Sequence, residues 1–160
     1  MRSRLWAPFG VALAIGGLVS AVSVRPLSLQ ELCAGADQIV YAKVEKVESY
    51  WKDLKIETRV TLSPYETWKG QTHDDVTVIV PGGTVGDITM RCSEAPTFHE
   101  SDKVVCFLRT QGDAKQVYGW FRGQYTIIGG QVREMQNMPL TTLRANVQSF
   151  VTVGPAGGGR

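Results

Sequence analysis

The sequence lacks the signatures of several common classes of function. It has no G-x-S-x-G motif for a serine nucleophile. His99-Glu100 does not extend to the H-E-x-x-H pattern of zinc proteases, because Lys103 occupies the last position. The stretch 81–86 has the glycines of a phosphate-binding loop without its lysine, and His73-Asp74-Asp75 supplies too few oxygen ligands for calcium. The sequence therefore predicts no cofactor, no metal site and no established catalytic motif.

A basic footprint is missing as well. The chain carries 17 Lys and Arg against 15 Asp and Glu, and two of the basic residues are Arg2 and Arg4. Without residues 1–23, 15 basic side chains face 15 acidic ones. Nucleic-acid binding depends on basic surface that neutralises phosphates, so the sequence argues against nucleic acid as a partner.

The N-terminus has the three-part layout of a secretory signal peptide. Two arginines precede the apolar run 5–19, and the small residues Ala21-Val22-Ser23 follow it. A retained membrane anchor is the alternative, but a spanning helix needs about 20 apolar residues and this run is shorter and rich in glycine. We therefore predict cleavage after residue 23, a secreted or periplasmic location, and membrane attachment only if the segment is retained.

Three cysteines leave an odd count, which in an exported protein indicates one disulfide plus a free thiol, or an intermolecular bond. Cys106 lies within the apolar run 104–108, where a buried thiol packs as a small apolar side chain. This favours a Cys33–Cys92 disulfide among the three possible pairings. A different interpretation makes Cys92 the nucleophile of a small hydrolase with His99 as its base, although no sequence feature marks the thiol as activated.

Hydrophobic alternation over most of the remaining chain predicts one mainly β domain, residues 24–153, ahead of a flexible glycine-rich tail, 154–160. Ser28 and Glu31 form a capping box for a short helix over 29–34, and Leu140, Leu143, Val147 and Phe150 share one face of a C-terminal helix that Asn137 is expected to cap. Proline at position 64 is expected to bend or end strand pairing. The predicted strands are 39–48, 55–63, 76–80, 104–108, 117–121, 124–128 and a short edge at 131–134. Short turns between these strands favour a small closed or nearly closed β-barrel of five or six strands.

Aromatic side chains provide the best candidate for a binding surface. Tyr50 and Trp51 fall in a polar segment, 49–53, that we expect to connect two strands. Tyrosine and tryptophan are the residues that most often anchor protein interfaces. We therefore predict partner contact at this pair.

A family resemblance adds to this interpretation. The stretch ELCAGADQIVYAKV at 31–44 is similar to the first helix and strand of the tissue inhibitors of metalloproteinases. Further motifs resemble secreted bacterial proteins with the same TIMP-like domain: Trp68-Lys69-Gly70, Pro81-Gly82-Gly83 with Gly86, Ala95-Pro96-x-Phe98, and VVCFLR at 104–109. The resemblance covers about residues 28 to 130 and implies an OB-fold. It also implies, as an alternative function, a metalloprotease-directed inhibitor or accessory domain that uses the turn of Pro81, Gly82 and Gly83.

The resemblance stops at the family's inhibitory group. Those inhibitors chelate the protease zinc through a mature N-terminal cysteine, whereas the first cysteine here is Cys33. We therefore carry over the fold and not the mechanism. The leading prediction is an exported, non-catalytic OB-like binding module for an unidentified protein or other extracytoplasmic ligand.

Overall fold

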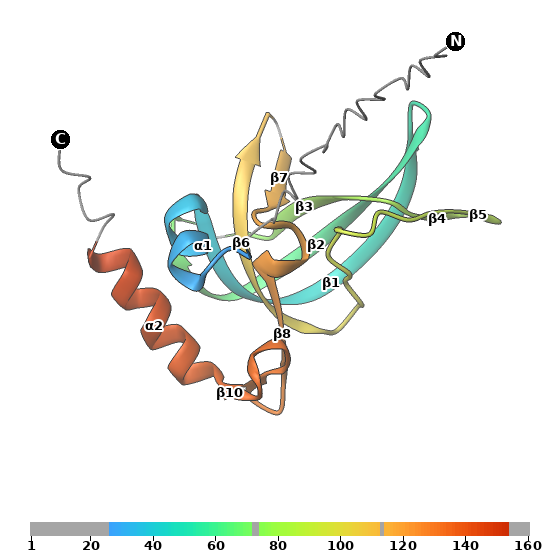
Figure 1. Cartoon of the computed structure of the whole chain (residues 1–160). Helices are drawn as coiled ribbons and strands as arrows, with labels where there is room; N and C mark the ends of the chain where they lie inside the picture. The colour runs from blue at the N-terminus through green and yellow to red at the C-terminus, as the bar shows by residue number, and fades with distance from the viewer. Residues whose placement is uncertain (1–25, 72–73, 113, 154–160) are drawn as a thin grey trace, which may run out of the picture.

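A computed structural model describes residues 26–71, 74–112 and 114–153 (Figure 1). The predicted signal peptide, the glycine-rich tail and His73 lie outside the described residues. The elements, in chain order, are α1 (Leu29–Gly35), β1 (Gln38–Lys52), β2 (Lys55–Lys69), β3 (Val76–Pro81), β4 (Gly83–Val85), β5 (Ile88–Met90), β6 (Lys103–Gln111), β7 (Ala114–Val117), η1 (Trp120–Gly123), β8 (Gln124–Ile128), β9 (Gln131–Val132), η2 (Arg133–Met135), β10 (Met138–Pro139) and α2 (Leu140–Val153).

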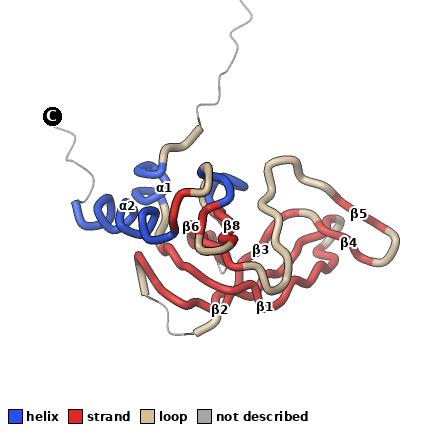
Figure 2. The backbone as a smooth tube through the Cα atoms, turned by 90° about the horizontal axis from the view of Figure 1, so that it is seen from below, coloured by secondary structure: helices blue, strands red, loops and turns tan. Residues whose placement is uncertain are grey.

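The fold is mainly β with one helix near each end of the described chain, as the sequence predicts. Strand pairings run from β1 to β2, β3, β7 and β6, and β6 pairs back to β1, so the pairings close into a ring. All of them are antiparallel except β3 with β7, which pair in parallel through Val78 and Lys115. Strands β8, β9 and β10 extend the sheet from β6, and β4 with β5 form a separate hairpin that projects to one side (Figures 1 and 2).

The first hairpin is longer than the sequence predicts. β1 and β2 are 15 residues each, and β2 continues through Pro64, which pairs with Ala42 beside a register shift. The register shift accommodates Pro64, which has no N–H to donate, and pairing resumes after it. The loop predicted at 49–53 in this hairpin is also wrong. The strand β1 runs to Lys52, and the turn follows at Asp53 and Leu54.

Two further predictions need correction at the C-terminal half. The strand predicted at 117–121 is wrong: β7 runs from Ala114 to Val117, and Gly119 and Trp120 take positive φ angles of 81° and 58° where a 3-10 turn begins. Asn137 does not cap α2: its φ is 59°, and residues 138–139 pair with β9 before the helix begins at Leu140. Local turn chemistry at both places overrides the period-based prediction.

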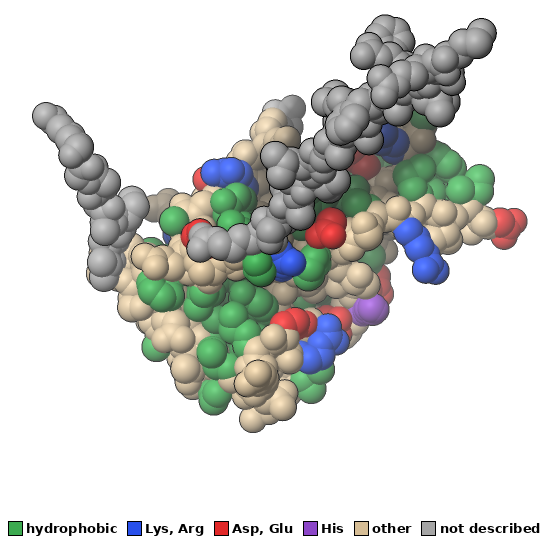
Figure 3. Space-filling model, viewed as in Figure 1, with side chains coloured by type: hydrophobic (Ala, Val, Ile, Leu, Met, Phe, Trp, Pro, Cys, Tyr) green, Lys and Arg blue, Asp and Glu red, His purple; other side chains and the backbone are tan. Residues whose placement is uncertain are grey.

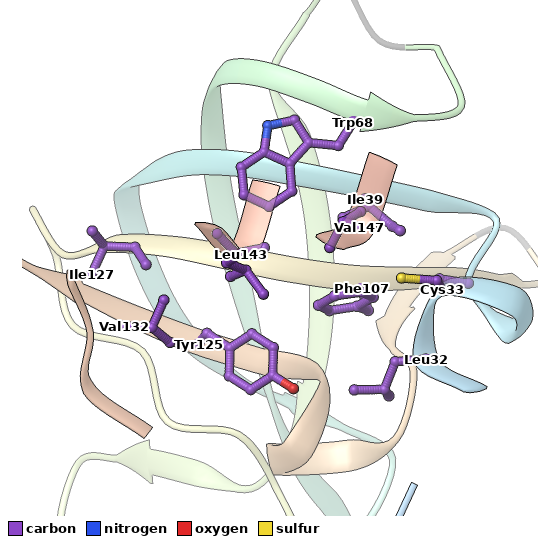
Figure 4. Packing of buried hydrophobic residues seen from close by; sticks show 12 residues of the cluster. Leu32, Cys33, Ile39, Trp68, Phe107, Tyr125, Ile127, Val132, Leu143 and Val147 are labelled. Carbon is purple, nitrogen blue, oxygen red and sulfur yellow. The ribbon is translucent and has the colours of Figure 1, made fainter. Parts of the chain in front are cut away.

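The core divides into two clusters. One lies inside the ring and contains Val40, Val60, Val78 and Cys106 among its buried residues. The other lies between the sheet and the two helices, where Leu32 and Cys33 from α1 and Leu143 and Val147 from α2 meet Phe107 and Tyr125 (Figure 4). The predicted capping box of α1 is present, with Ser28 Oγ accepting from the Glu31 N–H at 3.2 Å.

A half-buried lysine joins α1 to the sheet. Lys69 Nζ, at the end of β2, donates to the carbonyls of Cys33 at 2.7 Å and Ala36 at 2.6 Å. The last carbonyls of a helix lack intrahelical donors, and a cation there also complements the negative end of the helix dipole. Lys69 therefore fixes the position of α1 relative to the first hairpin.

Candidate functional site

A groove of about 490 Å³ opens at the end of the ring beside the β4–β5 hairpin. Val47 and Ser49 of β1 and Thr58 of β2 line one side, and the segment after β5, including Cys92, lines the other. Phe98 contributes to the apolar floor and is buried in the core cluster inside the ring. The groove therefore reaches from solvent to the inner cluster of the ring.

A chain of hydroxyl groups crosses the wall of this groove. Thr58 Oγ1 donates to the Gly82 carbonyl at 2.6 Å, so its contact with Ser49 Oγ at 2.9 Å requires Ser49 to be the donor. Ser49 Oγ in turn accepts from the Thr84 N–H at 3.3 Å. Each hydroxyl hydrogen is thus committed to a neighbour, which ties β4 to β1 and β2.

The glycines of the Pro81-Gly82-Gly83 stretch serve this contact. Gly83 has a φ of 137°, and a Cβ added there would overlap Ser49 Oγ and Thr58 Oγ1. Gly82 is buried and donates its N–H to the Ile56 carbonyl at 2.8 Å. The three residues therefore form part of the wall of the groove, and only Pro81 among them is exposed.

Tyr50 and Trp51, the predicted anchor pair, lie in the last three residues of β1, next to the turn. Tyr50 is half-buried: its hydroxyl donates to Glu57 Oε2 at 3.0 Å, and the Arg59 guanidinium lies 5.0 Å from its ring centroid. Burial and the hydrogen bond to Glu57 raise the pKa of Tyr50. Trp51 is 46% exposed, and Leu54 in the turn beyond it is 89% exposed. Trp51 rather than Tyr50 is thus available to a partner.

The structure adds two apolar residues that the sequence interpretation missed. Leu54 occupies the tip of the β1–β2 hairpin, and Ile88, which is 54% exposed, begins β5 in the neighbouring β4–β5 hairpin. Their only sequence signal is a single apolar residue within a polar turn, which is common on protein surfaces. Figure 3 shows hydrophobic side chains gathered at this end of the molecule.

The predicted Cys33–Cys92 disulfide is absent, and all three cysteines are free thiols. Cys33 is buried between α1 and the sheet, whereas Cys92 is exposed at the groove, so the two belong to different surroundings. Burial raises the pKa of Cys33 to about 11, with Lys69 opposing the shift, and burial also raises the pKa of Cys106. Both buried thiols therefore stay protonated at neutral pH.

The groove does not bring together Cys92 and His99, the two residues of the predicted hydrolase alternative. Cys92 lines it, but His99 is exposed and is not one of the lining residues. Within the described ranges, no group of three or more His, Cys, Asp and Glu side chains is placed to hold a metal ion. No helix of the described chain has both the length and the apolar character to cross a bilayer.

Two comparisons of the sequence with known proteins give no match. No protein-family model matches the sequence, and no curated protein is significantly similar to it. The resemblance to the tissue inhibitors of metalloproteinases, and the protease-directed function that it implies, therefore stay predictions.

Proposed function

We propose that this protein is an exported, non-catalytic binding module built on an OB-like β-barrel, and that it binds an extracytoplasmic partner protein at the hairpin end of the ring. The observation that carries the proposal is the exposure of Trp51 and Leu54 at the tip of the β1–β2 hairpin, next to a groove of about 490 Å³. Aromatic and large apolar side chains placed beside a groove are the usual anchors of protein interfaces.

Polar contacts make this tip a firm support for such anchors. Glu57 on β2 accepts from the Tyr50 hydroxyl and pairs with Lys52 Nζ at 3.3 Å. Arg59 covers the Tyr50 ring from the same strand. Because β2 holds the residues before and after Trp51, a partner would lose little binding free energy in ordering this strand.

The closed ring of pairings supports the barrel description. The sheet order β1-β2-β3-β7-β6 with a return to β1 gives five strands around the inner cluster, which is the strand number of an OB-fold. OB-folds present loops and strand ends as binding surfaces, although the fold alone does not specify the ligand.

A capture experiment tests the proposed surface. The chain, immobilised in its exported form, is used to retain proteins from the extracytoplasmic fraction of its source, and retained proteins are quantified by mass spectrometry. The double variant Trp51→Ala, Leu54→Ser is expected to lose the specific partner by about tenfold or more, since anchor residues contribute about 2 kcal/mol or more each.

The matched control removes exposed apolar surface elsewhere. Tyr65 and Ile128 are 51% and 58% exposed and lie outside the groove lining. The double variant Tyr65→Ala, Ile128→Ser should retain the partner as the unaltered chain does. Equal retention by the tip variant and this control would refute the proposed surface, and an intact mass that still includes residues 1–23 would refute cleavage on export.

A further inference from the structure

A second groove, of about 310 Å³, lies where the ring is weakest, between β3 and β7. The two strands pair only through Val78 and Lys115. Beyond that pair, Pro81 of β3 and Val117 of β7 line the groove on opposite sides. The volume is at the lower end of the range for ligand-binding cavities, about 300 to 1,000 Å³.

The main chain explains why the pairing ends there. In an antiparallel pair, alternate residues direct their N–H and C=O groups toward the neighbouring strand and away from it. The Gly82 N–H donates to Ile56 of β2, so Pro81 faces away from β2 and toward β7. The Tyr118 N–H donates to Phe107 of β6 at 2.7 Å, so Val117 faces toward β3. Proline has no N–H to continue the ladder, and the carbonyls of Pro81 and Val117 therefore face the groove without a ladder partner.

A single positive charge borders the same groove. The Arg109 guanidinium lies 4.7 Å from the ring centroid of Tyr118, and both residues line the groove. The Tyr118 ring is itself held against Gly35, where an added Cβ would overlap it. No Asp or Glu is among the lining residues, and no ion pair joins Arg109 to an acidic side chain within the described chain.

The remaining walls are mainly apolar, with Gln111 and Gln116 as the polar exceptions. Ile79 and Pro96 lie along one side, and Trp120, which is 53% exposed, lies at the other. The groove thus combines carbonyl acceptors, an unpaired guanidinium and apolar contacts. A ligand that fits must donate N–H groups, carry an anion and offer apolar side chains, which is the chemistry of an extended peptide with a free C-terminal carboxylate.

We propose that the groove between β3 and β7 binds the apolar C-terminal end of an extended peptide. The peptide carboxylate pairs with Arg109, and peptide N–H groups donate to the carbonyls of Pro81 and Val117, continuing the interrupted ladder. A fatty acid offers the carboxylate but no N–H donors, so it satisfies only part of the site. This groove shares Val80, Pro81 and Pro96 with the first groove but includes neither Trp51 nor Leu54 of the hairpin tip. Its test through Arg109 is therefore independent of the test of the tip.

Titration followed by backbone-amide NMR tests the site on the exported chain. The probe is the peptide acetyl-Ala-Val-Ala-Val with a free carboxylate, and its C-terminal amide is the matched ligand. We expect the acid to shift the signals of Val117, Gly119 and the Trp120 indole N–H. We also expect it to bind about tenfold more tightly than the amide, because a hydrogen bond to a charged group contributes about one such factor.

Variants separate recognition of the charge from general effects. Arg109→Gln should reduce the affinity for the acid to that for the amide. Arg122→Gln is the matched control, because Arg122 stacks on Phe121 and does not line the groove. Arg109 is exposed and Arg122 is half-buried, so both glutamine variants are expected to fold.

Each contrary outcome overturns the proposal. Equal shifts by acid and amide, or unchanged affinity in Arg109→Gln, would show that Arg109 does not recognise the peptide carboxylate. Shifts produced by decanoate and not by the peptide would make the ligand a small amphiphile. Concentration-dependent shifts of the groove amides with no probe present would make the occupant a second copy of this chain.

Discussion

At the scale of single residues, close contacts with backbone groups decide the shape of the site. Thr58 is a β-branched hydroxyl residue in a strand, an ordinary choice for a sheet, yet its hydroxyl fixes the Gly82 carbonyl and accepts from Ser49. Gly83 permits this arrangement because it has no Cβ to occupy the space between the two hydroxyls. Two hydroxyl side chains and one glycine thus position the β4–β5 hairpin.

Substitution of Gly83 tests this contact. Gly83→Ala is expected to lower the free energy of unfolding by about 3 kcal/mol or more, through a strained φ and loss of the Ser49–Thr58 contact. The matched control is Gly86→Ala, where φ is 59° but nothing lies within 4 Å. We expect the control to cost about 1 kcal/mol. Urea denaturation measures both, and equal losses would show that the hydroxyl contact contributes little.

At the scale of elements, α2 contributes stability through one narrow face. Leu143 and Val147 are fully buried against the sheet cluster that also contains Phe107 and Tyr125. Gln148 on the same helix is exposed. The helix is therefore held by tertiary packing of its apolar face rather than by the intrinsic stability of a 14-residue segment.

A cavity-forming substitution measures that packing. Leu143→Ala is expected to lower the free energy of unfolding by about 3 kcal/mol, within the range for a fully buried leucine. Gln148→Ala, one turn further along, should change it by less than about 0.5 kcal/mol. Thermal or urea unfolding followed by far-ultraviolet circular dichroism gives both values. A small effect of Leu143→Ala would mean that α2 docks only weakly.

At the scale of the whole molecule, the protein buries groups that must stay uncharged. Burial raises the pKa of Tyr125 from its ordinary value of 10.0 to about 12 and that of Cys33 from 9.0 to about 11. In the unfolded chain both groups ionise at their ordinary values, so above pH 9 the unfolded state releases protons that the folded state retains. Stability is therefore fully present below pH 9 and falls as the pH rises through 11 and 12.

Alkaline titration tests this coupling. Between pH 9 and 11 we expect the free energy of unfolding to fall by about 1 to 2 kcal/mol, allowing for partial solvent screening of these groups. Tyr125→Phe should flatten the fall between pH 10 and 12 and leave the part due to the other buried groups, Cys33 and Cys106 among them. Ile128→Val, at an exposed apolar residue of the same strand as Tyr125, is the control and should leave the profile unchanged. A profile that Tyr125→Phe does not alter would contradict the assignment.

Local sequence patterns were sufficient for much of the fold. Ser28 and Glu31 form the capping box because both partners lie within one turn of chain. Alternation at 55–63 and the apolar run at 104–108 identify strands, and the spacing of Leu143 and Val147 identifies the buried face of α2. These features depend on neighbours within about four residues, which a sequence displays directly.

The sequence by itself determined the mainly β class, the helix at each end of the described chain, and which side chains are apolar enough to be buried. Only the tertiary structure decided the rest. Whether Pro64 ends a strand, whether Cys33 meets Cys92, and what Gly83 packs against all depend on residues distant in the chain. The exposure of Trp51 and Leu54 and the groove beside Arg109 follow from how strands end against one another, and local periodicity carries no record of those long-range contacts.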